Sequence, residues 1–224
     1  MAAVAGIEAL VFDFDGLVLE TELPVYESWR REYEQLGVEL PFATWLETIG
    51  TADHDFDPLT HLEELIGRKL DHASLQERRK LYRDSLLHAQ ETLPGVRDWI
   101  RDARAAGLKL GVASSSSRAW VLGHLARLGL AEHWDTVRCS DDVERTKPDP
   151  ALYRLACADV AVDPARAVAL EDSANGVRAA RAAGMRVIAI PGPLTRQMDF
   201  GEADLVLESL AHATLAEGLG QLAR

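Results

Sequence analysis

Short apolar runs alternate with helical stretches from Pro94 onward, and this alternation restricts the fold more than any other feature of the chain. Residues 7–13 form one such run near the N-terminus. The others lie at 108–114, 135–139, 167–172, 185–190 and 203–207. Strands that alternate with helices of roughly 10 to 15 residues are typical of a parallel sheet with right-handed crossovers. We therefore predict an α/β fold with a Rossmann-like parallel sheet and helices on both of its faces.

The segment between Leu17 and Thr92 has a different character, because it is rich in charged, amphipathic helical patterns. Examples are "LPVYESWRREYEQLG", "FATWLETIG", "DPLTHLEELIGRKL" and "ASLQERRKLYRDSLLHAQ". None of these stretches alternates with the period of two that a half-buried strand requires. We therefore predict a four-helix cap inserted after the first strand. The predicted domains are an α/β core of residues 1–16 and 93–224 and a helical cap of residues 17–92.

The composition limits the partners and the location of the protein. With 36 acidic and 24 basic side chains, the chain has a formal net charge of −12, which disfavours binding to nucleic acid or anionic lipid. No apolar run approaches the roughly 18 residues of a membrane span, and the N-terminus lacks the basic segment of a signal peptide. Cys139 and Cys157 have no metal-site spacing and indicate buried thiols in a reducing compartment. We expect a cytoplasmic protein, either a monomer or a weak dimer, that binds neither nucleic acid nor membranes.

Polar clusters follow four of the predicted strands. They are Asp13 with Asp15, Ser114–Ser117, Lys147, and Glu171 with Asp172. Taken alone, each cluster is also compatible with a turn, a helix cap or a surface lysine. Ligands of open parallel sheets bind beyond the carboxyl ends of the strands, however, and all four clusters fall there. Their common location therefore favours one functional site.

The residue types in these clusters indicate phosphate chemistry. Asp13, Asp15 and Asp172 would repel one another unless a cation such as Mg²⁺ neutralised them. A phosphoryl group bound to that ion needs further donors, which Ser114, the backbone of the following helix and Lys147 can supply. One aspartate can then attack phosphorus to form an acyl phosphate, while a second transfers the proton.

These motifs resemble those of the haloacid dehalogenase-like (HAD) superfamily, in its phosphatase branch with an α-helical cap. That branch includes β-phosphoglucomutase and phosphoglycolate phosphatase. The resemblance of "DFDGLVLETE" to the first family motif implies that Asp13 is the nucleophile and Asp15 the general acid/base. The resemblance of "LEDSANG" to the fourth motif implies that Asp172 is a metal ligand and Glu171 its supporting partner. By the same resemblance, Mg²⁺ binds a carboxylate oxygen of Asp13, the backbone carbonyl of Asp15, and Asp172.

Two further motifs complete the resemblance. "VASS" resembles the second motif and implies phosphate binding by Ser114 and Ser115, and "KPDP" resembles the third and assigns Lys147 to the same role. The implied substrate is a small phosphorylated metabolite. In relatives the break between the second and third cap helices faces the active site. The candidates for substrate selection are therefore Thr51, Asp53 and His54.

Three functions remain to be compared at this point. Asp15 argues against carbon–halogen cleavage, because dehalogenating relatives lack this second aspartate. The leading prediction is a Mg²⁺-dependent phosphatase that acts through an aspartyl-phosphate intermediate. A sugar-phosphate mutase is the alternative, although Val25 and Asp53 stand near positions where mutases carry a histidine and an arginine. A receiver-like signalling phosphoacceptor is disfavoured, because its acceptor follows a middle strand and it has no helical insert.

Overall fold

A parallel β-sheet forms the centre of this computed structural model, which describes residues 6–222. The strands are β1 (Ala9–Phe12), β2 (Lys109–Ala113), β3 (Thr136–Arg138), β4 (Ala167–Glu171), β5 (Arg186–Ala189) and β6 (Leu205–Val206). Their order in the sheet is β3-β2-β1-β4-β5-β6, and every pairing is parallel. The order reverses at β1, which places its carboxyl end at the usual ligand position of such sheets. The predicted Rossmann-like parallel sheet is confirmed.

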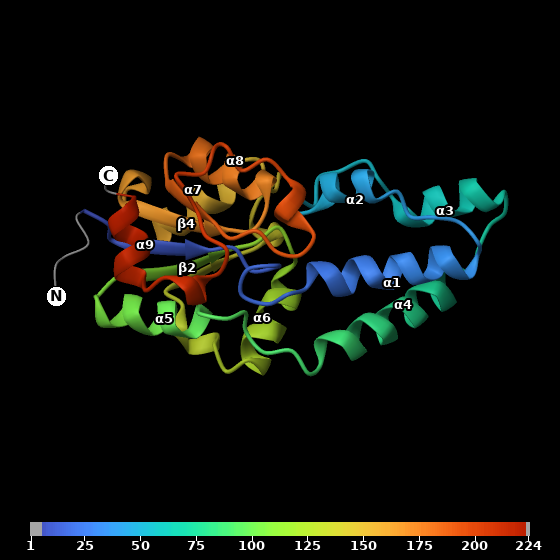
Figure 1. Cartoon of the computed structure of the whole chain (residues 1–224), viewed down its shortest axis with the longest axis horizontal. Coiled ribbons are helices and arrows are strands. Elements are labelled where there is room, and N and C mark those ends of the chain that lie inside the picture. The colour runs from blue at the N-terminus through green and yellow to red at the C-terminus, as the bar shows by residue number, and fades with distance from the viewer. Residues whose placement is uncertain (1–5, 223–224) are drawn as a thin grey trace.

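Helices cover both faces of the sheet (Figure 1). One face packs against α5 (Val96–Ala105), α6 (Arg118–Arg127) and α9 (Leu215–Gln221), and the other against α7 (Ala151–Asp159) and α8 (Ala174–Ala183). The sequence of β1 shows why both faces are buried. Leu10 and Phe12 join the apolar cluster on the first face, whereas Ala9 and Val11 join the cluster on the second. Because successive strand residues point to opposite faces, a continuously apolar strand can bury both.

The segment between β1 and β2 forms a helical layer that projects beyond the carboxyl end of the sheet (Figure 1). Its helices are α1 (Glu22–Gln35), α2 (Phe42–Thr48), α3 (Pro58–Ile66) and α4 (His72–Leu87). They enclose an apolar cluster of their own, which includes Trp29, Tyr33, Trp45 and Leu62. The flanking residues Leu17–Leu19 pack with the apolar cluster of the sheet instead. The domain boundary at residues 16 and 17 stays a prediction.

Serine residues begin two helices that leave the carboxyl edge of the sheet. Ser117 accepts a hydrogen bond from Trp120 N at the start of α6, and Ser173 accepts one from Gly176 N at the start of α8. Such caps satisfy backbone N–H groups that have no partner within the helix. Both helix N-termini therefore lie beside the polar clusters. Among residues 6–222, no helix is both long enough and apolar enough to cross a lipid bilayer.

Candidate active site

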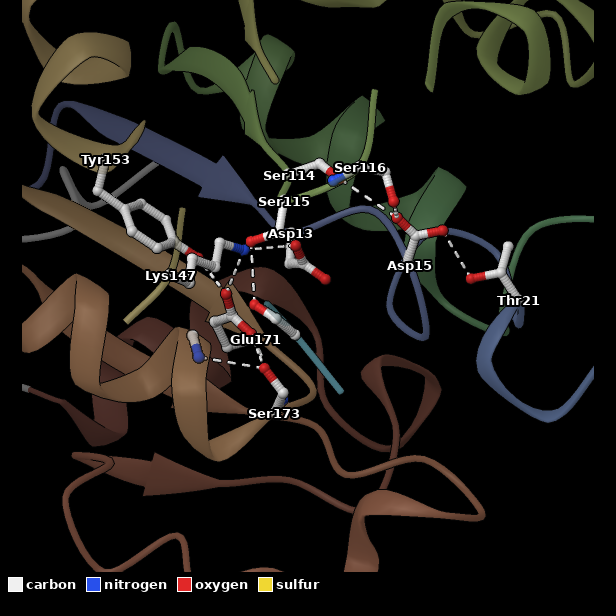
Figure 2. Close-up of polar contacts among 12 residues, drawn as sticks. Asp13, Asp15, Thr21, Ser114, Ser115, Ser116, Lys147, Tyr153, Glu171 and Ser173 are labelled. Carbon is white, nitrogen blue, oxygen red and sulfur yellow. Dashed lines mark hydrogen bonds and ion pairs between the residues drawn. The ribbon is translucent and has the colours of Figure 1, made fainter. Parts of the chain in front are cut away.

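Lys147 lies at the centre of a buried charged cluster at the carboxyl edge of the sheet (Figure 2). Its side chain is fully buried, and its Nζ lies 2.5 Å from Asp13 Oδ1 and 2.6 Å from Glu171 Oε1. Asp13 directly follows β1, and Glu171 ends the neighbouring strand β4. An ammonium between two carboxylates satisfies the charges of a site from which water is excluded. The lysine therefore joins the acids of two adjacent strand ends.

Glu171 is held by several groups at once. Besides Lys147, the Tyr153 hydroxyl donates to Oε1 at 2.5 Å, and the Ser173 hydroxyl donates to Oε2 at 3.2 Å. Gly176 passes so close that a Cβ there would lie 1.9 Å from Oε1, so this position requires glycine. Both oxygens of Glu171 already have protein partners. Glu171 is therefore arranged to hold neighbouring residues in place.

Asp172 differs from Glu171, since both of its carboxylate oxygens are buried without a hydrogen-bond partner among residues 6–222. Ligand atoms of Asp13, Glu171 and Asp172 all lie within 4.8 Å of one another. Gly16, with a φ of +75°, allows this approach, because a Cβ there would come within 2.2 Å of Asp172 Oδ2. Buried oxygens without donors are suited to a hard cation, which binds oxygen ligands. The residues present therefore fit a divalent metal ion.

The pKa values of this cluster show how the charges act on one another. Burial raises the pKa of Asp172, and the nearby Asp13 carboxylate raises it further. Burial also raises the pKa of Asp13, although Lys147 partly opposes the change. For Lys147, burial favours the neutral amine, but the Asp13 and Glu171 carboxylates outweigh burial and raise the pKa of the ammonium. One ammonium does not balance three buried acids, so the cluster favours additional positive charge.

Asp15 points toward a separate group of hydrogen-bond donors (Figure 2). Its Oδ1 accepts from the Thr21 hydroxyl at 2.7 Å and from Trp120 Nε1 at 2.8 Å. Its Oδ2 accepts from the hydroxyls of Ser114 at 3.2 Å and Ser116 at 2.7 Å. Each carboxylate oxygen thus has two donors. This network orients Asp15 through residues from the segment after β2, from α6 and from the segment before α1.

The serine run after β2 lies between these two networks. The Ser114 backbone N–H donates to Arg138 O of β3 at 2.9 Å, which fixes the start of the run. The Ser115 hydroxyl donates to Gly50 O of the helical cap at 3.0 Å. The Ser116 N–H donates to Ser114 Oγ at 3.0 Å. The predicted phosphate-binding serines therefore lie at the carboxyl edge of the sheet, and Ser115 also contacts the cap.

A cavity of about 430 Å³ lies above the two aspartates. It is lined by Asp13, Asp15, Glu22, Thr48, Gly50, Thr51, Ala52, His54, Ser114–Ser117 and Ser140. Thr51 and His54, two of the three residues predicted to select substrate, thus reach the cavity. Asp53 has another contact, because its Oδ2 accepts from the backbone N–H and the hydroxyl of Thr146, at 2.5 and 2.7 Å. Asp53 links the cap to the residue before Lys147.

Several side chains of the site were not among the predicted site residues. Ser116 lies in the serine run and Thr21 in the first motif, so their positions within these motifs could have identified them as site residues. Trp120 and Tyr153 are spaced from the motifs by helical turns, and the sequence does not show which way an aromatic ring points. Glu22 lines the cavity, where burial and the Asp15 carboxylate raise its pKa well above the ordinary value.

Known proteins are similar to this sequence over most of its length. Residues 7–184 match the haloacid dehalogenase-like hydrolase family. The chain is 42% identical to YhcW of Bacillus subtilis, across 94% of this chain and 95% of that protein. It is 37% identical to CbbY of Cereibacter sphaeroides, across 95% and 96% of the two chains. It is 31% identical to hexitol phosphatase B of Escherichia coli, across 98% of this chain and all of that protein.

Solved structures agree with this assignment. CbbY from Rhodobacter sphaeroides in complex with phosphate has a TM-score of 0.68 and 32% identity, with 92% of this chain and 95% of that chain covered. β-Phosphoglucomutase from Clostridium difficile has a TM-score of 0.76 with 97% of each chain covered, and at 21% identity it supports the fold alone. The predicted family and the enzyme class of phosphoric monoester hydrolase are confirmed. This chain belongs to the haloacid dehalogenase-like hydrolases.

Proposed function

We propose that this enzyme is a Mg²⁺-dependent phosphatase that hydrolyses a small sugar-type or polyol monophosphate through an aspartyl phosphate on Asp13. The observation that carries the proposal is the pairing of Asp13 with the fully buried Lys147 beside the unpartnered oxygens of Asp172. A carboxylate that is to attack a phosphate dianion must be surrounded by positive charge, since the two would otherwise repel each other. Lys147 supplies part of that charge, and the acids beside it suit a cation that supplies the rest.

Asp13, Asp172 and the backbone carbonyl of Asp15 would hold the Mg²⁺, with Glu171 as support. The bound ion would neutralise charge on the phosphoryl oxygens and on the nucleophile. Asp172 suits this role better than Glu171 does. Both Asp172 oxygens lack donors within the described part of the chain, whereas the oxygens of Glu171 already accept hydrogen bonds from Tyr153 and Ser173.

The proposed reaction has two steps. In the first, an Asp13 oxygen forms a bond to phosphorus while the bond from phosphorus to the leaving oxygen breaks, and protonated Asp15 gives that oxygen its proton. In the second, Asp15 takes a proton from water, and the resulting hydroxide attacks phosphorus to release inorganic phosphate and free Asp13. Lys147 and Ser114 hold phosphoryl oxygens throughout.

The cavity lining supports a hydroxyl-rich leaving group. Thr48, Thr51 and the serine run provide hydroxyls, and Glu22 provides a carboxylate. Within the part of the chain that the structure describes, the residues lining this cavity include no lysine or arginine. A leaving group with a second negative charge would therefore be repelled, whereas a neutral polyol could form hydrogen bonds. The relative named hexitol phosphatase B is consistent with this choice.

The mutase alternative has less support. A mutase must grip the second phosphate of a bisphosphate intermediate, but the predicted position of its arginine is occupied by Asp53, which is bonded to Thr146. Val25, at the predicted histidine position, lines a hollow beside Asp15 and has no group that transfers protons.

We also propose that the enzyme works in the cytoplasm as a monomer or weak dimer, and that it binds neither nucleic acid nor membranes.

The proposal is tested with a panel of sugar and polyol monophosphates and Mg²⁺, with phosphate release as the readout. The wild type should release phosphate, and Asp13→Asn, purified identically, should form no phosphoenzyme and release none. Activity of Asp13→Asn above a trace would exclude the covalent mechanism. β-Glucose 1-phosphate with and without the matching 1,6-bisphosphate tests the alternative. Bisphosphate-dependent formation of glucose 6-phosphate that outpaces phosphate release would identify a mutase.

A further inference from the structure

Trp120 donates its indole N–H to Asp15 Oδ1 at 2.8 Å, although it belongs to none of the four motifs. We propose that Trp120 is a positioning residue, which anchors Oδ1 of Asp15 so that Oδ2 carries the proton transferred in catalysis. The inference rests on the proposed role of Asp15 as the general acid/base. It adds a residue to that role and states which of the two carboxylate oxygens reacts.

The two oxygens of Asp15 differ in how easily their donors can be withdrawn. The donors on Oδ2 are the hydroxyls of Ser114 and Ser116, and a hydroxyl turns away by rotation about one bond. Ser114 is also the residue proposed to bind phosphate, so bound substrate would draw its 3.2 Å hydrogen bond away from Oδ2. The indole N–H on Oδ1 can only donate, and it moves only if the whole ring moves. Withdrawal of the Ser114 hydroxyl by substrate and rotation of the Ser116 hydroxyl therefore free Oδ2, while the indole N–H still holds Oδ1.

The indole ring is fixed by groups on different elements. His124 of α6 meets it edge-on, with ring centroids 4.3 Å apart. Arg83 of the cap helix α4 lies over its face, with Cζ 4.8 Å from the ring centroid. Arg83 is itself tied to Asp84 by a hydrogen bond of 2.8 Å. Because a cation over an indole face attracts the ring, Arg83 holds Trp120 from the cap side.

The proton transfer follows from this arrangement. In the first step, the O–H bond on Oδ2 breaks and the proton passes to the leaving oxygen as its bond to phosphorus breaks. Asp15 is then an ionised carboxylate, and Oδ2 takes a proton from the attacking water in the second step. Trp120 exchanges no proton in either step. Loss of its N–H should therefore slow reactions in proportion to their need for protonation of the leaving group.

The experiment compares Trp120→Phe with Asp15→Asn on phenyl phosphate and p-nitrophenyl phosphate. These probes have similar shapes, but nitrophenolate is the better leaving group and needs less protonation. Trp120→Phe retains an aromatic ring beside Arg83 and His124 while it removes the N–H. The matched control is Trp134→Phe, since the buried Trp134 Nε1 has no hydrogen-bond partner among the described residues. Thermal unfolding of each variant measures the structural cost separately.

We expect Trp120→Phe to lower turnover of phenyl phosphate on the order of 10- to 100-fold, as misplacement of a reacting group does, and that of p-nitrophenyl phosphate by much less. Asp15→Asn should show the same pattern more strongly, and Trp134→Phe should show neither loss. Equal losses on both probes, or no loss, would overturn the role of Trp120 provided that Asp15→Asn shows the pattern. Absence of the pattern in Asp15→Asn would instead reject the proposed role of Asp15, and the inference with it.

A second measurement does not depend on activity or on how well Trp120→Phe folds. The indole N–H resonance of Trp120 in the wild type should shift when Asp15 is replaced by alanine, whereas that of Trp134 should not. An unchanged Trp120 resonance would overturn the contact. Arg83→Met tests whether Arg83 of the cap holds the Trp120 ring in place. It should reproduce the leaving-group pattern of Trp120→Phe in weaker form and should add nothing in the Trp120→Phe background, because residues that act through one another are not additive.

Discussion

Lys147 Nζ and Asp13 Oδ1 lie 2.5 Å apart in an ion pair that is almost entirely shielded from water. Asp13 follows the central strand β1, and Lys147 lies in the segment between β3 and α7, 134 residues away. The pair therefore joins two segments of the core that are far apart in the sequence, and it also brings the proposed nucleophile to the ammonium that would bind phosphate. One contact thus serves both the fold and the proposed chemistry.

Replacement of Lys147 by methionine should destabilise the protein strongly. The substitution leaves the Asp13 and Glu171 carboxylates buried without their counter-charge, and breaking a buried ion pair in this way costs about 3–5 kcal/mol. Urea unfolding gives the free energy directly. The control is Lys80→Met, because Lys80 pairs with Asp84 on the surface and such pairs contribute roughly 0–1 kcal/mol. Similar losses in both variants would contradict the account of the buried pair.

The positions of the acids and of Lys147 could be predicted from the sequence because strand periodicity locates strand ends. Asp13, Lys147 and Asp172 each follow an apolar run, and the carboxyl ends of parallel strands lie at one edge of a sheet. That these side chains lie close together could therefore be predicted without knowing how each one is oriented. The helical insert could be predicted for a similar reason, since its apolar spacing differs from that of the strands.

Contacts between the cap and the sheet could not be predicted in this way. Whether Asp53 faces the cavity or Thr146 depends on the conformation of a loop between helices, which no periodic pattern fixes. The direction of Trp120 depends on Arg83, a residue of another helix. Such contacts are set by tertiary packing, so they became visible only in the structure.

Asp172→Asn should stabilise the metal-free protein while it abolishes the response to Mg²⁺. Both oxygens of Asp172 are buried without donors from any residue that the structure describes, and they lie beside other carboxylates. Removal of the charge should therefore raise the unfolding free energy in EDTA by about 0.5–2 kcal/mol. In the wild type, Mg²⁺ should raise the melting temperature and restore turnover after EDTA, whereas the larger Ca²⁺ should support turnover poorly. Full turnover of the wild type in metal-free buffer would contradict the metal site.

The contact between Asp53 and Thr146 should control docking of the cap rather than the choice of substrate. Asp53→Ala removes both hydrogen bonds to Thr146, and with a net value of roughly 0.5–1.5 kcal/mol per bond KM should rise about 2- to 12-fold for each bond lost. Thr146→Val removes the hydroxyl that donates to Asp53 and also accepts from the Ala52 backbone N–H of the cap, so it should show a rise of similar size. Kinetics on several monophosphates measure both effects. A changed ranking of substrates in Asp53→Ala would instead support the sequence-based prediction that Asp53 selects substrate.

Glu63 holds together the far end of the cap. It accepts hydrogen bonds from Lys69 Nζ at 2.7 Å and from Leu70 N at 2.8 Å, and His72 Nε2 lies 2.7 Å from its Oε1. The hydrogen bond from Lys69 is the largest cause that lowers the pKa of Glu63 to about 2, followed by those from Leu70 and His72. The ionised form is therefore the one that the folded cap binds.

Glu63→Gln should reduce the stability of the protein at neutral pH but not in strong acid. Because the folded-state pKa of Glu63 lies below its unfolded value, ionised Glu63 stabilises the fold above the unfolded pKa of 4.5. That stabilisation declines as the pH falls from there toward about 2. Melting temperatures of wild type and variant should therefore differ at about pH 7, and the difference should shrink below pH 4.5 and disappear only near pH 2. Glu64→Gln, at the exposed neighbouring position, is the control, and a wild-type advantage that persisted in acid would contradict this linkage.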